Sequence, residues 1–234
     1  MKIAFLSESP ADEAVLRILV EGALKEKPTV ASAGYRARGW PNVLQVLPAV
    51  IRHLHFNTDV DTLVVTGDSD DSPVHTAAHE APQYYHPHCR MCQLRAVFRQ
   101  TGKRFPAAHG RLRVRRVVGV AVPALEAWLL CGVEDSVNEA AWTEGQARGV
   151  LPYTRAELKL RVYRTERPSL PHEIACAVRE AGVTGGICDV SNTIFRASRR
   201  YCEICANRFR KSVEISPIAR SRSLVAMEMA AILP

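Results

Sequence analysis

Acidic side chains follow three apolar segments of this chain, and their type suits them to metal chemistry. In chain order they are Glu8, then Asp68 with Asp70, then Glu126. A hard divalent cation such as Mg²⁺ takes oxygen ligands, usually one or two carboxylates with water and substrate phosphate. Acids brought together would repel one another unless a cation neutralised them. The alternative is structural: Glu8 caps a helix, and the aspartates form an ordinary polar turn.

The elements that must position these acids alternate between strand and helix. Short apolar, β-prone runs predict strands over residues 2–6, 29–33, 62–66 and 114–122. Helical spacing predicts helices from Ala11 onward and over 41–55, 89–103 and 125–131. This alternation predicts an α/β fold, a Rossmann-like parallel sheet flanked by helices. Functional groups gather beyond the carboxyl ends of such strands, so we expect the acids to meet at one edge.

The pattern changes after about residue 133, where prolines interrupt it. Short helices are expected over residues 155–164, 172–180, 192–211 and 221–231. We therefore divide the chain into an α/β core over 1–132 and a helical, basic C-terminal portion over 133–234 that packs on the core.

The charge of the chain is unevenly distributed. Lys and Arg number 31 against 24 Asp and Glu, a net charge of +7. Residues 90–116 hold nine basic side chains and no acid, and residues 148–222 hold fifteen basic side chains and seven acids. The tracts are either solvated basic faces or surfaces for a polyanion, against which the acids hold cations. The composition is that of a globular protein and excludes a disordered or collagen-like chain.

Three segments resemble the motifs of TOPRIM domains. Residues 8–16, ESPADEAVL, look like the opening motif E-G-x-x-D-x-x-x-L, with Ser9 in place of the glycine. Residues 64–70, VVTGDSD, resemble the second motif, an apolar strand that ends in D-x-D. Residues 122–130, VPALEAWLL, resemble the P-x-x-E-A-W-L-L segment of bacterial TOPRIM-like proteins. Those proteins are similar to the nuclease half of the OLD (overcoming lysogenisation defect) family and to anti-phage effectors.

The resemblance implies a TOPRIM-like, Mg²⁺- or Mn²⁺-dependent nuclease of a bacterial cytoplasm, with a role in phage defence. Glu8 would act as general base or metal ligand, Asp68 and Asp70 would hold the cation, and Asp71 and Glu126 would be additional ligands. The first basic tract would face a DNA or RNA backbone, through Arg90, Arg95, Arg99, Lys103 and Arg104.

Two other functions stay open at this point. One is a non-catalytic module on the same fold that binds nucleic acid or joins a complex, which Ser9 favours. The other is phosphotransfer on a small nucleotide. The chain contains no G-x-x-x-x-G-K-[ST] motif, so an ATPase, which OLD-like nucleases often carry, would come from a separate subunit.

Histidine and cysteine offer a second kind of metal site. Cys89 and Cys92 form one C-x-x-C pair and Cys202 and Cys205 another, and together they would make a Cys₄ zinc site. Simple burial of the thiols is the favoured alternative. For His75 and His79 three roles stay open: assistance to a leaving group, binding of a metal, or a place in a solvated loop. No apolar run reaches 18 residues and no secretory signal is seen, so we expect a cytoplasmic protein with reduced thiols and no membrane segment.

Overall fold

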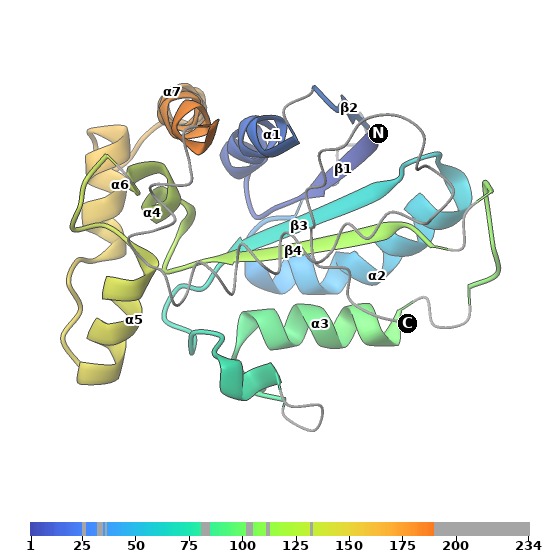
Figure 1. The fold of residues 1–234 in the computed structure, drawn as a ribbon, viewed down its shortest axis with the longest axis horizontal. Helices are drawn as coiled ribbons and strands as arrows, with labels where there is room; N and C mark the ends of the chain where they lie inside the picture. The colour runs from blue at the N-terminus through green and yellow to red at the C-terminus, as the bar shows by residue number, and fades with distance from the viewer. Residues whose placement is uncertain are drawn as a thin grey trace.

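A sheet of parallel strands forms the centre of the fold. The computed structural model describes residues 1–24, 27–31, 35, 37–80, 85–101, 105–110, 113–131 and 133–189. Its strands are β1 (Lys2–Leu6), β2 (Thr29–Val30), β3 (Thr62–Asp68) and β4 (Arg115–Ala121). They pair in the order β2-β1-β3-β4, and every pairing is parallel (Figure 1). The predicted α/β, Rossmann-like class is confirmed.

Helices cover both faces of this sheet. Helix α1 (Pro10–Leu24) lies on one face, and α2 (Trp40–Asn57) and α3 (Arg90–Gln100) lie on the other (Figure 1). Strand β3 is buried on both sides: Val64 packs with residues of α1, whereas Leu63 and Val65 pack with residues of α2 and α3. This double burial explains why β3 reads as a continuous apolar run.

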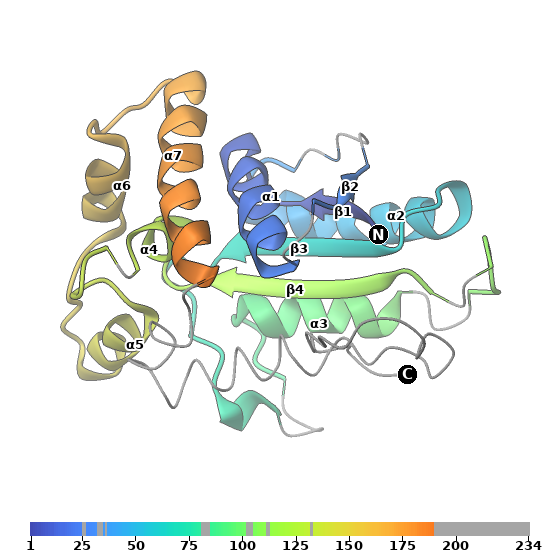
Figure 2. The same ribbon diagram turned by 45° about the horizontal axis from the view of Figure 1, so that its top comes forward.

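Four further helices extend the structure at the carboxyl end of the sheet. They are α4 (Leu125–Leu130), α5 (Glu139–Arg148), α6 (Arg155–Tyr163) and α7 (Leu170–Asp189). Helix α7 packs along α1, as Figure 2 shows, and Trp142, Leu158 and Ala177 share one core with Val15 of α1. Helix α5 was not predicted. The helices expected over 192–211 and 221–231 lie outside the described residues.

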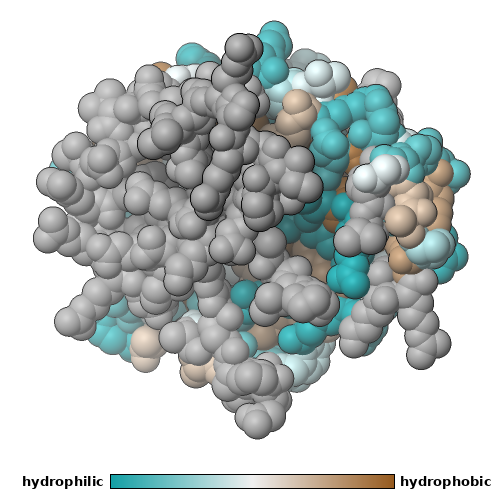
Figure 3. Space-filling model, turned by 45° about the vertical axis from the view of Figure 1, so that its right-hand side comes forward, coloured by the Kyte–Doolittle hydropathy of each residue, from teal (hydrophilic) through white to brown (hydrophobic). Residues whose placement is uncertain are grey.

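Figure 3 turns the right-hand side of the Figure 1 view forward, and on the coloured surface in that view hydrophilic and hydrophobic residues lie side by side. Within the described part of the chain, no helix is both long and apolar enough to cross a lipid bilayer.

One carboxylate fastens the end of β4 to α4. Oε1 of Glu139 accepts hydrogen bonds from the backbone N–H of Val122, at 3.1 Å, and from Nε1 of Trp128, at 2.6 Å. Burial raises the pKa of Glu139, and these two donors oppose that shift. Glu139 therefore fixes the chain on both sides of the segment that leads into α4.

Replacing Glu139 tests this attachment. Glu139→Ala leaves two donors without their acceptor, and a buried donor left unpaired costs about 1–3 kcal/mol. We expect the free energy of unfolding, measured by urea denaturation, to fall by about 2 kcal/mol. Glu139→Gln keeps an acceptor oxygen and should lose less than half as much. Equal losses in the two variants would contradict this role.

Candidate functional site

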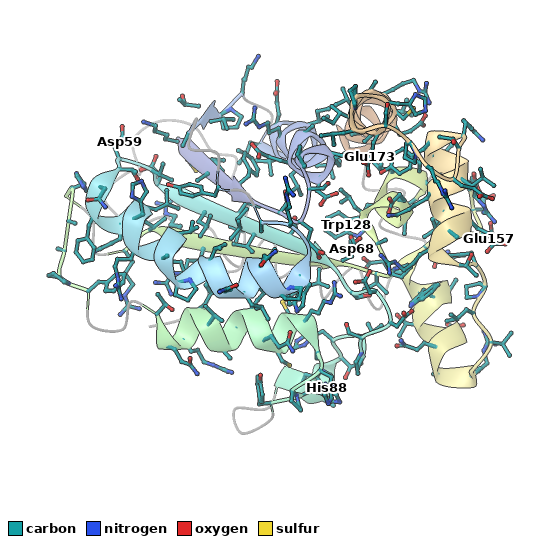
Figure 4. The ribbon with its side chains drawn as sticks, turned by 180° about the vertical axis from the view of Figure 1, so that it is seen from behind. Asp59, Asp68, His88, Trp128, Glu157 and Glu173 are labelled. Atoms are coloured by element: carbon teal, nitrogen blue, oxygen red, sulfur yellow. The ribbon has the colours of Figure 1, made fainter. Side chains whose placement is uncertain are left out.

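Four carboxylates from separate elements converge at the carboxyl edge of the sheet. Glu8 follows β1, Asp68 ends β3, Asp12 lies in the first turn of α1 and Glu126 in the first turn of α4. Figure 4 shows Asp68 at the end of its strand. Burial raises the pKa of Asp68 well above its usual range, and the neighbouring Glu126, Asp12 and Glu8 raise it further. These carboxylates therefore sit close enough to repel one another.

Backbone donors hold two of these carboxylates in place. The N–H of Asp68 donates to Oε1 of Glu8 at 3.0 Å, and the N–H of Leu125 donates to Oδ1 of Asp68 at 2.9 Å. Glu8 reaches β3 closely because residue 67 is glycine: a Cβ there would lie 2.8 Å both from Oε1 of Glu8 and from the Trp40 ring. Burial raises the pKa of Glu8 as well.

Asp12 joins this group although sequence reasoning did not single it out as a site residue. It forms a reciprocal cap with Ser9: Ser9 N–H donates to Oδ2 of Asp12 at 2.9 Å, and Asp12 N–H donates to Oγ of Ser9 at 3.1 Å. Burial raises the pKa of Asp12 to about 6, with further contributions from Glu126 and Glu8. The signal was present in the sequence, since Asp12 is the aspartate of the E-x-x-x-D motif.

Glu126 carries an oxygen whose bonding capacity is not used. The residue is 4% exposed, and its Oε2 accepts no hydrogen bond from the described residues. Burial and then the Glu126 carboxylate raise the pKa of the neighbouring Tyr163 hydroxyl. Burial also raises the pKa of Glu173 of α7, and Glu126 adds to that rise. A buried carboxylate oxygen is costly without a partner, and a cation would supply one.

Two arginines balance part of the negative charge. NH1 of Arg90 donates to the carbonyl oxygen of Asp68 at 2.6 Å and to Oε1 of Glu8 at 3.3 Å, and NH2 pairs with Asp70. The same guanidinium lies over the Trp40 ring, 4.8 Å from its centroid. NH2 of Arg155, from the start of α6, lies 2.5 Å from Oδ1 of Asp70. No sequence signal pointed to Arg155.

Of the remaining predicted site residues, Asp70 shares these arginine contacts, and the others lie apart from them or outside the described chain. Asp70 is engaged by the two arginines and adopts a left-handed backbone conformation with φ of 50°, and Asp71 is exposed. NH1 of Arg95 lies 3.2 Å from Nε2 of His75. Arg99 is exposed and lines a depression with Tyr85 and Gln100. Lys103, Arg104, Cys202 and Cys205 lie outside the described residues.

The donor set of the carboxylates suits a hard cation. Glu8, Asp12, Asp68 and Glu126 offer only oxygen ligands, as Mg²⁺ and Mn²⁺ prefer. Among the residues that the structure describes, only the side chains of His75, His79, Cys89 and Cys92 bring three or more ligand atoms within 4.8 Å of one another. The carboxylates Glu8, Asp12, Asp68 and Glu126 do not form such a group in this structure.

Comparison with protein-family models, with curated proteins and with solved structures found no match. The chemistry of the carboxylates and arginines at the carboxyl edge is therefore the basis for inferring a function.

Proposed function

We propose that the protein is a metal-dependent nuclease that uses Mg²⁺ or Mn²⁺ to cleave phosphodiester bonds of DNA or RNA. The observation that carries this proposal is the convergence of Glu8, Asp12, Asp68 and Glu126 from four elements, beside the guanidinium groups of Arg90 and Arg155. Oxygen ligands for a cation next to cationic donors for phosphate are the groups that phosphodiester cleavage requires.

Each side chain has a distinct part in this proposal. Asp12, Asp68 and Glu126 would hold the cation, which when bound polarises the phosphate and lowers the pKa of water. Glu8 is the candidate general base, because burial raises the pKa of its carboxyl from the ordinary value toward neutrality. Arg90 and Arg155 would bind non-bridging phosphate oxygens, exchanging their contacts with Asp70 for contacts with substrate.

A second function is favoured by one specific feature, the ion pairs that arginines already form with two of the acids. Arg90 already contacts Glu8 and Asp70, and Arg155 contacts Asp70. If these pairs persist, Glu8 and Asp70 remain neutralised by arginine, and the protein would bind nucleic acid or a partner without cleaving it. This is the non-catalytic module on the same fold.

Cleavage assays separate the two functions. Labelled DNA and RNA are incubated with the protein and Mg²⁺ or Mn²⁺, and Asp68→Asn and Glu8→Gln should each lower the rate by about 10²-fold or more. The matched control is Asp59→Asn, an exposed aspartate paired with Lys2 and seen at the opposite end of the sheet from Asp68 in Figure 4. It should cleave at the wild-type rate.

The contrary results are equally distinct. Equal rates for wild type, Asp68→Asn and Glu8→Gln would exclude these acids from catalysis. Salt-dependent binding of nucleic acid that survives Asp68→Asn, with no cleavage under either cation, would instead establish the non-catalytic module.

Burial of Asp12, with smaller contributions from Glu126 and Glu8, also predicts how stability depends on pH in EDTA. The pKa of Asp12 rises from 3.8 to about 6 on folding, so the folded state keeps its proton to a higher pH than the unfolded state does. The stabilisation is complete below about pH 4 and is lost as pH rises to about 6. We expect the free energy of unfolding to fall over this interval, and to fall less in Asp68→Asn, which removes a second carboxyl whose pKa is raised in the fold.

Magnesium should reverse this effect at neutral pH. A cation that binds the folded state alone raises the melting temperature. Differential scanning fluorimetry at pH 7.5 should therefore show that Mg²⁺ raises the melting temperature of wild type and of Asp59→Asn. The melting temperature of Asp68→Asn should rise much less. The same rise in all three proteins would contradict a cation at the acidic edge.

A further inference from the structure

A second group of potential ligands lies on the α2–α3 side of the sheet, away from the acids. His75 follows β3, His79 belongs to the short 3₁₀ helix Ala77–Glu80, and Cys89 and Cys92 belong to the start of α3. Each offers one ligand atom, and these four atoms lie within 4.8 Å of one another. The group takes no part in the proposed nuclease chemistry.

Two sulfur–nitrogen distances within this group match those around a tetrahedral metal. Sγ of Cys89 and Sγ of Cys92 lie 3.5 Å and 3.6 Å from Nδ1 of His75. A tetrahedral zinc ion with bonds of about 2.3 Å to sulfur and about 2.0–2.1 Å to nitrogen places such atoms about 3.6 Å apart. Two thiolates and two imidazoles form a closed structural zinc set, and none of these ligands is the oxygen that Mg²⁺ or Ca²⁺ prefers.

We propose that His75, His79, Cys89 and Cys92 bind a structural Zn²⁺ ion. The site assembles from the chain's own described residues and has no need of Cys202 and Cys205. The two cysteines are 1% and 3% exposed and are not joined in a disulfide, so both sulfurs are available to an ion within the fold. Burial raises the pKa of the Cys89 thiol to about 11, so zinc binding would have to displace its proton.

The ion would fasten the start of α3 to the segment that follows β3. Cys89 is the N-cap residue of α3, yet its side chain makes no capping hydrogen bond. Arg90 lies between the two cysteines in sequence and contacts Glu8 and Asp70. Zinc would therefore fix the helical turn from which Arg90 reaches the acidic edge. With Nδ1 of His75 on the metal, Nε2 carries the ring proton, so Arg95, 3.2 Å from Nε2, must turn away.

The competing explanation is a network of thiol–imidazole hydrogen bonds without metal. The same sulfur–nitrogen distances of 3.5 Å and 3.6 Å fit such bonds. Cys176 provides a matched control, since it is also buried and its Sγ lies 3.5 Å from Nε2 of His172 on the same helix. That pair has two members only and does not belong to the four-ligand group.

Metal content of the purified full chain tests the proposal. By mass spectrometry of the metal, we expect about one zinc per chain in wild type, in Cys176→Ser and in the double variant Cys202→Ser/Cys205→Ser. Cys89→Ser and Cys92→Ser should each hold at least tenfold less. Loss of zinc from the Cys202/Cys205 variant, or equal zinc in Cys92→Ser and Cys176→Ser, would overturn the assignment.

Cobalt substitution keeps the test decisive if the cysteine variants fail to fold. Wild-type protein stripped of metal and supplied with Co²⁺ should develop the visible absorption of a tetrahedral ion with two thiolate ligands, and Zn²⁺ should remove it. Chelation should lower the melting temperature and added Zn²⁺ should restore it. An octahedral cobalt spectrum, or no spectrum at all, would overturn the proposal independently of any nuclease activity.

Discussion

Carboxylates that share one partly buried sheet edge repel one another, and several contacts around them offset that repulsion. Backbone N–H groups of Asp68 and Leu125 donate to two of the acids. Arg90 neutralises part of the charge, and Gly67 leaves the space through which Glu8 approaches β3. These contacts do not offset the full cost of placing the acids here, because the pKa values of Asp12 and Asp68 remain raised, first by burial and then by the neighbouring carboxylates. A divalent cation is the simplest group that would complete the neutralisation.

The helices beyond the sheet contribute to the same edge. Thr154 and Glu157 form a capping box that begins α6, and Arg155 is the first residue of that helix and pairs with Asp70. Helix α6 also supplies Tyr163, which lies against Glu126. Residues of α5, α6 and α7 share a core with α1 and α4, so the C-terminal helices help to shape the acidic edge as well as covering one end of the sheet.

The sequence was informative where local pattern decides structure and much less so where tertiary contacts do. Strand β1 was predicted with its observed bounds, because a short buried strand leaves a continuous apolar run. Helix α5 was missed because its buried side is small, consisting of Trp142 and Gly145. The sequence brought out Glu8 and Asp68, yet no local pattern could pair Arg155 with Asp70 or bring His75 beside Cys89. Those contacts depend on how separate elements fold against one another.

The central claim is that the acidic edge holds a divalent cation for phosphodiester cleavage. The most direct measurement is a crystal structure of the protein soaked in Mn²⁺, with anomalous diffraction recorded from the metal. We expect a strong anomalous peak bounded by Asp12, Asp68 and Glu126, near the carboxylate of Glu8. A well-occupied crystal with no peak at that edge, or with manganese elsewhere in the molecule only, would contradict it.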